Sequence, residues 1–362
     1  MLTSLPDPAP GTVRRTLSLS LETSVGGVWS GGLRVTASGR DLLLGDGGDD
    51  GTSGDSALPG RSRVLRAARM SVTIDSASCV TGIDSELPAA VTDPLIGAAA
   101  LRGFRARLDG LDQLDPSSLE AAVLDELPTV RLISGYARMI EQIGLTGADG
   151  VVEAAATSGP GPLPPPSDHG RLSPMVGVCA GWALGATADS RIRAGVPLMS
   201  GTPLAPALHS MTPYFHPEPA PWPRSMRRRR ILDVTAGGGG YEVFEYFRDS
   251  HFDTVLREGA LHEYEVHARV GAARDAVGEY PLEHVEVVPH ALPFGECSLA
   301  APNAAELTGA PLRDISGTVR GRLGGTRGCT HLNDTLRFLR YVPALTDDLP
   351  GATARRIDNS GS

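Results

Sequence analysis

One stretch near the end of the chain combines a thiol, an imidazole and a glycine-rich turn. Residues 324–334 read Gly-Gly-Thr-Arg-Gly-Cys-Thr-His-Leu-Asn-Asp, and an apolar helical pattern begins at Leu332. A thiol at the start of a helix lies against the positive end of the helix dipole, which favours the thiolate. The stretch therefore predicts an activated cysteine, Cys329, with His331 as its neighbour.

Cys297 is the predicted partner of this thiol. It follows the predicted strand 283–291 and precedes a predicted helix, so both cysteines should lie at turns on the same edge of one sheet. Two thiolates and an imidazole are natural ligands of zinc or iron, and Glu296 or Asp334 would supply a carboxylate. The candidate ligands for zinc or iron are Cys297, Cys329, His331 and Glu296.

The same residues allow two other interpretations. Without a metal, Cys329 would be a nucleophile with His331 as its general base. The thiols could also be small buried hydrophobic groups, with the Thr330–His331 pair only capping the helix. The Cys-x-His spacing is not that of a zinc finger, so the sequence leaves all three interpretations open.

Alternation suggests two further candidates. In residues 261–270, His262 and Tyr264 share the inward face of a predicted strand with apolar side chains. They could line a pocket, or they could be core groups that find hydrogen-bond partners.

The remaining histidines favour structural roles. The polar segment 248–253 contains an Asp-x-His spacing that could serve a metal, but a turn between two strands explains it. His169, His209 and His216 fall in a Pro-rich segment and are expected at the surface.

Composition excludes several chemistries. All 33 basic residues of the chain are arginine, so a Schiff-base lysine for pyridoxal phosphate and the lysine of a P-loop are absent. No Gly-x-Gly-x-x-Gly signature is found, so we expect no NAD and no ATP. The net charge of −9 argues against a nucleic-acid partner. We interpret the one basic run, Arg227 to Arg230, as the solvated start of a strand.

Location follows from hydropathy and cysteine usage. No apolar N-terminal run resembles a signal peptide, and no stretch is long enough to cross a membrane. We therefore expect a cytoplasmic protein without a membrane partner, whose four cysteines are reduced thiols or metal ligands. Oligomeric state cannot be read from this pattern.

The strand and helix patterns predict an α+β fold built by tandem duplication. Arg229-Arg230-Ile231-Leu232 echoes Arg14-Arg15-Thr16-Leu17, and each half reads as an antiparallel meander followed by helices that cover one sheet face. The expected divisions are a first copy at 1–145, a Pro-rich connection at 146–226 and a second copy at 227–362.

Chemistry is expected in the second copy. All nine histidines lie at or beyond His169, and three of the four cysteines lie there too. Residues 134–136 mark the place where the first copy lacks the thiol. Within the connection, residues 158–166 predict a polyproline linker, and residues 45–61 predict a flexible loop in the first copy. The apolar stretch 175–186, with Cys179 and Trp182, should either plug the cleft between copies or line a ligand pocket.

The motifs resemble a family of unknown function. An uncharacterised bacterial family has a motif that resembles residues 328–332, Gly-Cys-Thr-His-Leu, preceded by Leu-Gly-Gly and by an upstream Glu-Cys. Its actinobacterial members look similar to this chain at 124–128, 134–137 and 329–337. This resemblance implies no established activity. A fainter similarity is to the SufE/NifU-like fold of iron–sulfur scaffold and sulfur-acceptor proteins, in which Cys297 and Cys329 match two cysteine positions. A cluster scaffold would need a third thiol.

These observations predict a cytoplasmic enzyme of lyase, isomerase or hydrolase type. It would act on a small organic molecule held between the copies, with Cys297, Cys329 and His331 as metal ligands or as nucleophile and base. The alternatives are a non-catalytic iron–sulfur or sulfur-relay scaffold, and a small-molecule or protein-binding module with structural thiols.

Overall fold

The protein is described by a computed structural model. It covers residues 2–23, 32–45, 62–143, 151–152, 175–196, 198, 201–272 and 279–352, and for 23, 137–143 and 151–152 it describes the backbone alone. The expected loop at 45–61, apart from residue 45, and the expected linker at 158–166 lie outside these residues, as does His169.

Eight strands of the described residues form one antiparallel sheet in the order β10-β9-β8-β7-β1-β2-β3-β4. Their bounds are β1 (Val13–Thr23), β2 (Leu33–Leu43), β3 (Arg63–Ile74), β4 (Val80–Ser85), β7 (Met226–Gly237), β8 (Gly240–Phe252), β9 (Glu258–Gly271) and β10 (Leu282–Ala291). A short parallel pair joins β5 (Val151–Val152) to β6 (Thr202–Pro203).

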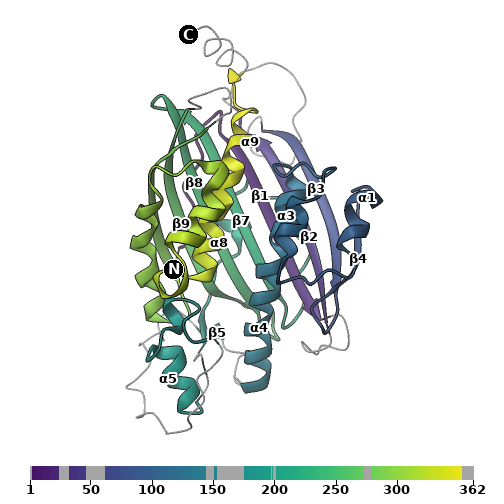
Figure 1. The fold of residues 1–362 in the computed structure, drawn as a ribbon, viewed down its shortest axis with the longest axis vertical. Coiled ribbons are helices and arrows are strands. Elements are labelled where there is room, and N and C mark those ends of the chain that lie inside the picture. The colour runs from purple at the N-terminus through teal and green to yellow at the C-terminus, as the bar shows by residue number, and fades with distance from the viewer. Residues whose placement is uncertain are drawn as a thin grey trace.

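Helices connect and cover these strands. The α-helices are α1 (Ala89–Thr92), α2 (Phe104–Asp109), α3 (Leu119–Asp125), α4 (Leu127–Ile143), α5 (Thr187–Arg193), α6 (Leu208–Met211), α7 (Ile315–Arg322), α8 (Thr330–Phe338) and α9 (Val342–Thr346). Shorter 3₁₀ turns lie at Asp93–Leu95, Ala180–Trp182, Leu312–Asp314, Gly325–Arg327 and Leu339–Tyr341, and a longer one at Gly295–Leu307. Figure 1 shows α3, α4, α8 and α9 on one face of the sheet, so the predicted α+β class is confirmed.

The two predicted copies contribute to a single sheet. Strands β1–β4 and strands β7–β10 each form a four-stranded meander, and the meanders join where β1 pairs with β7. Val13 lies opposite Val234 and Leu17 opposite Arg230 in this antiparallel pairing. The duplication itself stays a prediction, but the join places side chains of both halves over the same sheet face.

The four arginines of the basic run lie inside this join, so their expected exposure is wrong. Arg228 and Arg230 are fully buried, and Arg227 and Arg229 are 3% exposed. The run belongs to β7, a central strand whose two faces are both covered, so no side of it faces water. Because side chains alternate along a strand, Arg228 and Arg230 point towards the helices, while Arg229 pairs with Glu218 on the opposite face.

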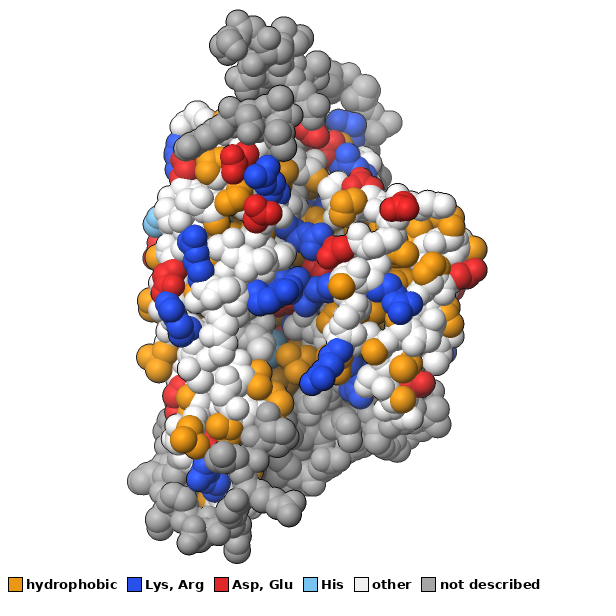
Figure 2. Space-filling model, in the orientation of Figure 1, with side chains coloured by type: hydrophobic (Ala, Val, Ile, Leu, Met, Phe, Trp, Pro, Cys, Tyr) orange, Lys and Arg blue, Asp and Glu red, His pale blue; other side chains and the backbone are white. Residues whose placement is uncertain are grey.

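Carboxylates from both halves surround the arginines under the helices. Arg228 binds Asp249 through two hydrogen bonds of 2.7 and 2.8 Å, and its third nitrogen lies 2.8 Å from both Glu126 and Asp334. Arg105 donates to Asp334 at 2.6 Å. Since Glu126 lies between α3 and α4 and Asp334 lies on α8, this ion network ties the helices of the two halves to β7. In Figure 2, arginine side chains gather at the surface between α8 and α3.

We expect Asp334→Asn to lower the free energy of unfolding by about 3–5 kcal/mol, because it removes one of the carboxylate charges that balance the buried Arg228 and Arg230. Burial alone would raise the pKa of Asp334, but Arg105, Arg230 and Arg228 hold this pKa well below its ordinary value. Urea unfolding measures the loss, with the exposed Asp314→Asn as the matched control. A loss no larger than that of the control would show that the network does not stabilise the fold.

The opposite sheet face is covered by the segment that precedes β7. Leu208, Met211 and Phe215 pack there against Ile231 and Tyr246. His216 follows them and is 6% exposed, so its expected surface position is wrong. Its ring nitrogens lie 2.8 Å from the hydroxyls of Thr16 and Ser18 on β1, because the apolar residues before it hold the segment against the sheet. His209 is exposed, as expected.

His216 should make stability depend on pH. Burial and the nearby Arg40 and Arg229 lower the pKa of His216 from 6.5 to about 3. Between these values the unfolded chain takes up a proton that the folded chain does not, so the free energy of unfolding falls by about 1.4 kcal/mol per pH unit as pH decreases. His216→Gln should remove this contribution in urea titrations at about pH 7 and pH 5. His209→Gln, the exposed control, should keep the wild-type pH dependence; an equal pH dependence in all three proteins would contradict the assignment.

Among the described residues, none of the helices combines the length and the apolar character needed to span a bilayer.

Candidate functional site

The predicted thiol site is assembled at the start of α8. Cys329 occupies the position before the helix, as the glycine-rich turn suggested, and its sulfur is buried. Cys297 lines the same cavity as this sulfur and influences its acidity, and the Tyr264 hydroxyl donates a hydrogen bond to the sulfur at 3.4 Å. The Nδ1 atom of His331 lies 4.0 Å from the same sulfur. Three potential donors therefore surround Cys329.

The structure brings Cys297, Cys329 and Tyr264 together from three elements. Tyr264 projects from β9, whose alternation places it on the helix side of the sheet. Cys297 lies in the 3₁₀ turn Gly295–Leu307 that follows β10, and Cys329 begins α8. The turn before α8 needs glycine, because a Cβ at Gly328 would lie 2.1 Å from the carbonyl oxygen of Leu323.

The thiols face a small cavity of about 170 Å³. Its wall is mostly apolar and combines segments that are far apart in the sequence. Tyr136 reaches it from the first half, so the segment that lacks a thiol there still contributes to the same site. The lining residues are Leu132, Gly135, Tyr136, Met175, Val178, Cys179, Trp182, His262, Phe294, Cys297, Cys329, Thr330 and His331.

The segment with Cys179 and Trp182 closes one side of this cavity. The backbone N–H of Ala180 donates to the carbonyl of Gly328 at 2.9 Å, next to Cys329. A Cβ at Gly181 would lie 2.6 Å from the Cys297 sulfur, so only glycine allows this close approach. Of the two roles that the sequence left open for the segment, lining a pocket is the one observed.

The three thiols differ in acidity. The pKa of Cys329 lies well below its ordinary value, and a hydrogen bond from Cys297 is the largest cause. Burial acts in the opposite direction, whereas contacts with His331 and Tyr264 lower this pKa further. The same hydrogen bond, together with burial, raises the pKa of Cys297. Burial also raises the pKa of Cys179 to about 11. The site therefore favours one thiolate, on Cys329, beside two neutral thiols.

A second group of polar atoms meets on the other side of His331. His331 Nε2 lies 3.9 Å and His262 Nδ1 lies 3.8 Å from Oδ2 of Asp249, and all three residues are buried. The two imidazole rings stack with centroids 3.5 Å apart, and Tyr136 packs against both. Burial is the main cause of a pKa of His262 well below 6.5, so this ring is neutral at neutral pH.

Asp249 is the residue that sequence reasoning placed wrongly. The segment 248–253 was expected to be a turn, but β8 continues to Phe252 and the chain turns only afterwards. Asp249 lies directly opposite His262 on β9, next to a register shift between Asp249 and Ser250. A charged strand is possible here because Arg228 binds the Asp249 carboxylate and replaces its water. The available signal was the Asp-x-His spacing, although His251 binds Thr202 instead.

The two predicted carboxylates lie away from the thiols. Glu296 accepts hydrogen bonds from the backbone and hydroxyl of Thr187, at 2.9 and 2.8 Å. Asp334 lies about one helical turn beyond His331 and joins the ion network described above. A group of potential metal ligands does form elsewhere among the described residues. One ligand atom from each of Asp249, His262 and His331 lies within 4.8 Å of the other two.

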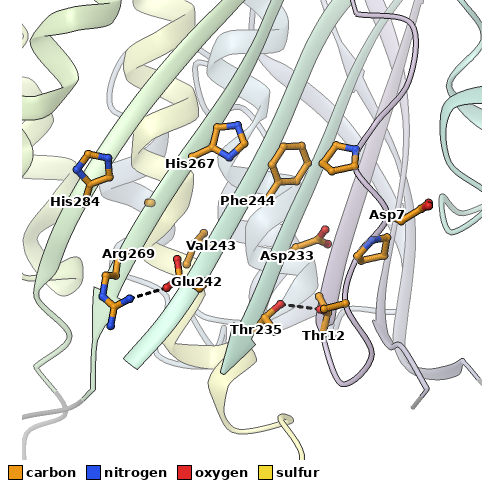
Figure 3. A pocket seen from close by; sticks show the side chains of 14 residues that line it. Asp7, Thr12, Asp233, Thr235, Glu242, Val243, Phe244, His267, Arg269 and His284 are labelled. Atoms are coloured by element: carbon orange, nitrogen blue, oxygen red, sulfur yellow. Dashed lines mark hydrogen bonds and ion pairs between the residues drawn. The ribbon is translucent and has the colours of Figure 1, made fainter. Parts of the chain in front are cut away.

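A larger hollow of about 310 Å³ lies on the other face of the sheet (Figure 3). Its polar side chains mostly bind each other: Thr12 contacts Thr235 at 2.7 Å, and Arg269 contacts Glu242 at 2.7 Å. Asp233 is occupied by Arg14.

Comparison with known families finds a match for the segment that carries part of the site. Residues 226–344, from the start of β7 into α9, match a family described as a protein of unknown function (DUF2889). The predicted resemblance to a family of unknown function is thereby confirmed, and the matched segment contains Cys297, Cys329, His331, His262 and Asp249. Searches of curated proteins and of solved structures found no match. The likeness to the SufE/NifU-like fold stays a prediction.

Tyr264→Phe should make the Cys329 thiolate less stable. A hydrogen bond to a charged group contributes about 1.5–3 kcal/mol, so its loss should raise the apparent pKa of Cys329 by roughly one to two pH units. The pH dependence of iodoacetamide alkylation, read at Cys329 by peptide mass analysis, measures this pKa. Tyr280→Phe removes a hydroxyl bound to Thr346, and since neither residue lines the cavity it is the control. Identical profiles for the two variants would contradict the role of Tyr264.

Proposed function

We propose that this chain is a thiol-dependent enzyme that acts on a small, largely apolar organic molecule. Cys329 is the nucleophile of the proposed reaction. The observation that supports it best is the placement of the Cys297 thiol, the Tyr264 hydroxyl and the His331 imidazole around one sulfur at the wall of a small apolar cavity. Neighbours that stabilise the thiolate make a cysteine more reactive.

The proposed chemistry is of hydrolase type. The Cys329 sulfur attacks an electrophilic carbonyl carbon; an S–C bond forms, and the electron pair of the carbonyl double bond moves to oxygen. Expulsion of the leaving group with its bonding electrons gives an acyl-enzyme, which water then hydrolyses. The Cys297 thiol and the Tyr264 hydroxyl, which hold the thiolate in the resting protein, are the nearest donors for the developing charge.

Cavity size limits the substrate. At about 170 Å³ it is smaller than the 300–1,000 Å³ typical of sites for drug-sized ligands. The rings of Trp182 and Phe294 meet edge to face at one wall, with centroids 6.3 Å apart, and provide an apolar surface. We therefore expect short-chain or single-ring esters and thioesters to fit, and charged or larger molecules to be excluded.

The test is formation of a covalent intermediate. On incubation with short-chain p-nitrophenyl esters and thioesters, the wild-type chain should release product and gain the mass of one acyl group at Cys329. Cys329→Ser should lose both signals, while Cys79→Ser, which removes the cysteine outside the cavity, should keep them. Turnover that persists in Cys329→Ser would reject the proposal, as would a thiol that reacts with iodoacetamide no faster than Cys79.

One observation favours a second candidate, an iron–sulfur or sulfur-relay protein. The sequence supplied only two thiols for such a role, and Cys179 now lines the same cavity as Cys297 and Cys329. Anaerobic reconstitution with iron and sulfide would test it. Visible absorbance of a cluster that disappears in Cys179→Ser would favour the scaffold, and colourless protein with an acylated Cys329 would favour the enzyme.

A further inference from the structure

We propose that Asp249, His262 and His331 bind one divalent transition-metal ion, of the class of Zn²⁺ or Fe²⁺. Two imidazoles and one carboxylate form the donor set that binds these ions in many proteins. This ligand set differs from the thiolate set that the sequence suggested, because it excludes Cys297, Cys329 and Glu296. Its existence does not depend on the proposed thiol chemistry.

The first support is the lack of other partners for the ligand nitrogens. His262 Nδ1 and His331 Nε2 are buried and have no hydrogen-bond partner. Both face Oδ2 of Asp249 at distances too long for a hydrogen bond, 3.8 and 3.9 Å. Buried polar atoms without partners destabilise a fold. A cation between these three atoms would satisfy all of them at once.

Geometry is the second support. Ligand atoms about 2.0–2.2 Å from a metal lie roughly 3–3.5 Å from one another. The ligand atoms of the three side chains already lie within 4.8 Å of one another. Binding would draw them together by several tenths of an ångström and open the stacked rings of His262 and His331 towards the ion.

Outer contacts hold the carboxylate in place. Arg228 donates to both oxygens of Asp249, and its own charge is balanced by Glu126 and Asp334. Each carboxylate oxygen has two lone pairs, so Oδ2 retains one for a metal. Metal-bound carboxylates usually have such an outer partner. The ion network of the fold thus orients one proposed ligand.

The metal would also define the protonation of His331. Coordination through Nε2 leaves the proton on Nδ1, which faces the Cys329 sulfur at 4.0 Å. In that tautomer His331 donates to the thiolate instead of accepting its proton. The metal and the thiol would therefore lie on opposite sides of one imidazole, with the metal supporting the thiolate from a distance.

The test is metal analysis of the full chain after chelation and anaerobic reloading with Zn²⁺ or Fe²⁺. We expect one ion per chain in the wild type. His262→Ala and Asp249→Asn should each weaken binding by more than the roughly 10–100-fold that loss of an outer partner costs. The matched control is His290→Ala. His290 pairs with Glu265 and does not belong to the three proposed ligands, so this variant should bind the ion as the wild type does. Circular dichroism checks that each variant is folded. If Asp249→Asn unfolds, His262→Ala still tests the site, because it leaves the Arg228–Asp249 pair intact.

Three results would overturn the site. They are a wild type that binds no ion, stoichiometric binding in both ligand variants, and loss of the ion in Cys297→Ser or Cys329→Ser, which would indicate thiolate ligands. Co²⁺ as a probe separates the last case, because thiolate ligation adds an intense charge-transfer band that nitrogen and oxygen ligands lack. Failure of the thiol chemistry leaves the metal stoichiometry unchanged, so the two proposals fail independently.

Discussion

The buried ion network around Arg228 is the interaction on which the other features depend. Arg228 lies on the strand where the two meanders join, and it binds Glu126 from the first half and Asp249 and Asp334 from the second. Charges so far from water require partners on every side, so the strands and helices can pack in only a few ways that keep each partner in place. The same contacts orient Asp249 towards the histidines, which links the stability of the fold to the site.

His331 connects the two proposed sites. Its Nδ1 faces the Cys329 sulfur and its Nε2 faces Asp249, so one ring lies between the proposed nucleophile and a candidate metal ligand. Placing it in the first turn of α8 positions both nitrogens with a single backbone element. Most of the apolar wall of the cavity comes from α4 and from the segment before α5, which both precede the matched residues 226–344 in the sequence.

Much of the fold and half of the site could be predicted. The meanders follow from period-two alternation, and the glycine turn before a helix correctly placed Cys329 and His331. The four-arginine run could not be read correctly, because its burial depends on Glu126 and Asp334, which lie more than a hundred residues away. Asp249 was missed for the same reason: a polar segment looks like a turn unless the partner of each charge is known.

By itself the sequence determined local matters: which residues alternate on a strand, where helices begin, and that the thiols and imidazoles concentrate in the second half. These depend on neighbours within a few residues, which composition and spacing encode directly. Only the tertiary structure decided that β1 and β7 join the halves into one sheet, that Cys179 and Tyr136 reach the thiols, and that Asp249 rather than Glu296 faces His331. Those outcomes depend on burial and charge pairing between distant segments, and a buried charge is stable only where the whole fold supplies its partner.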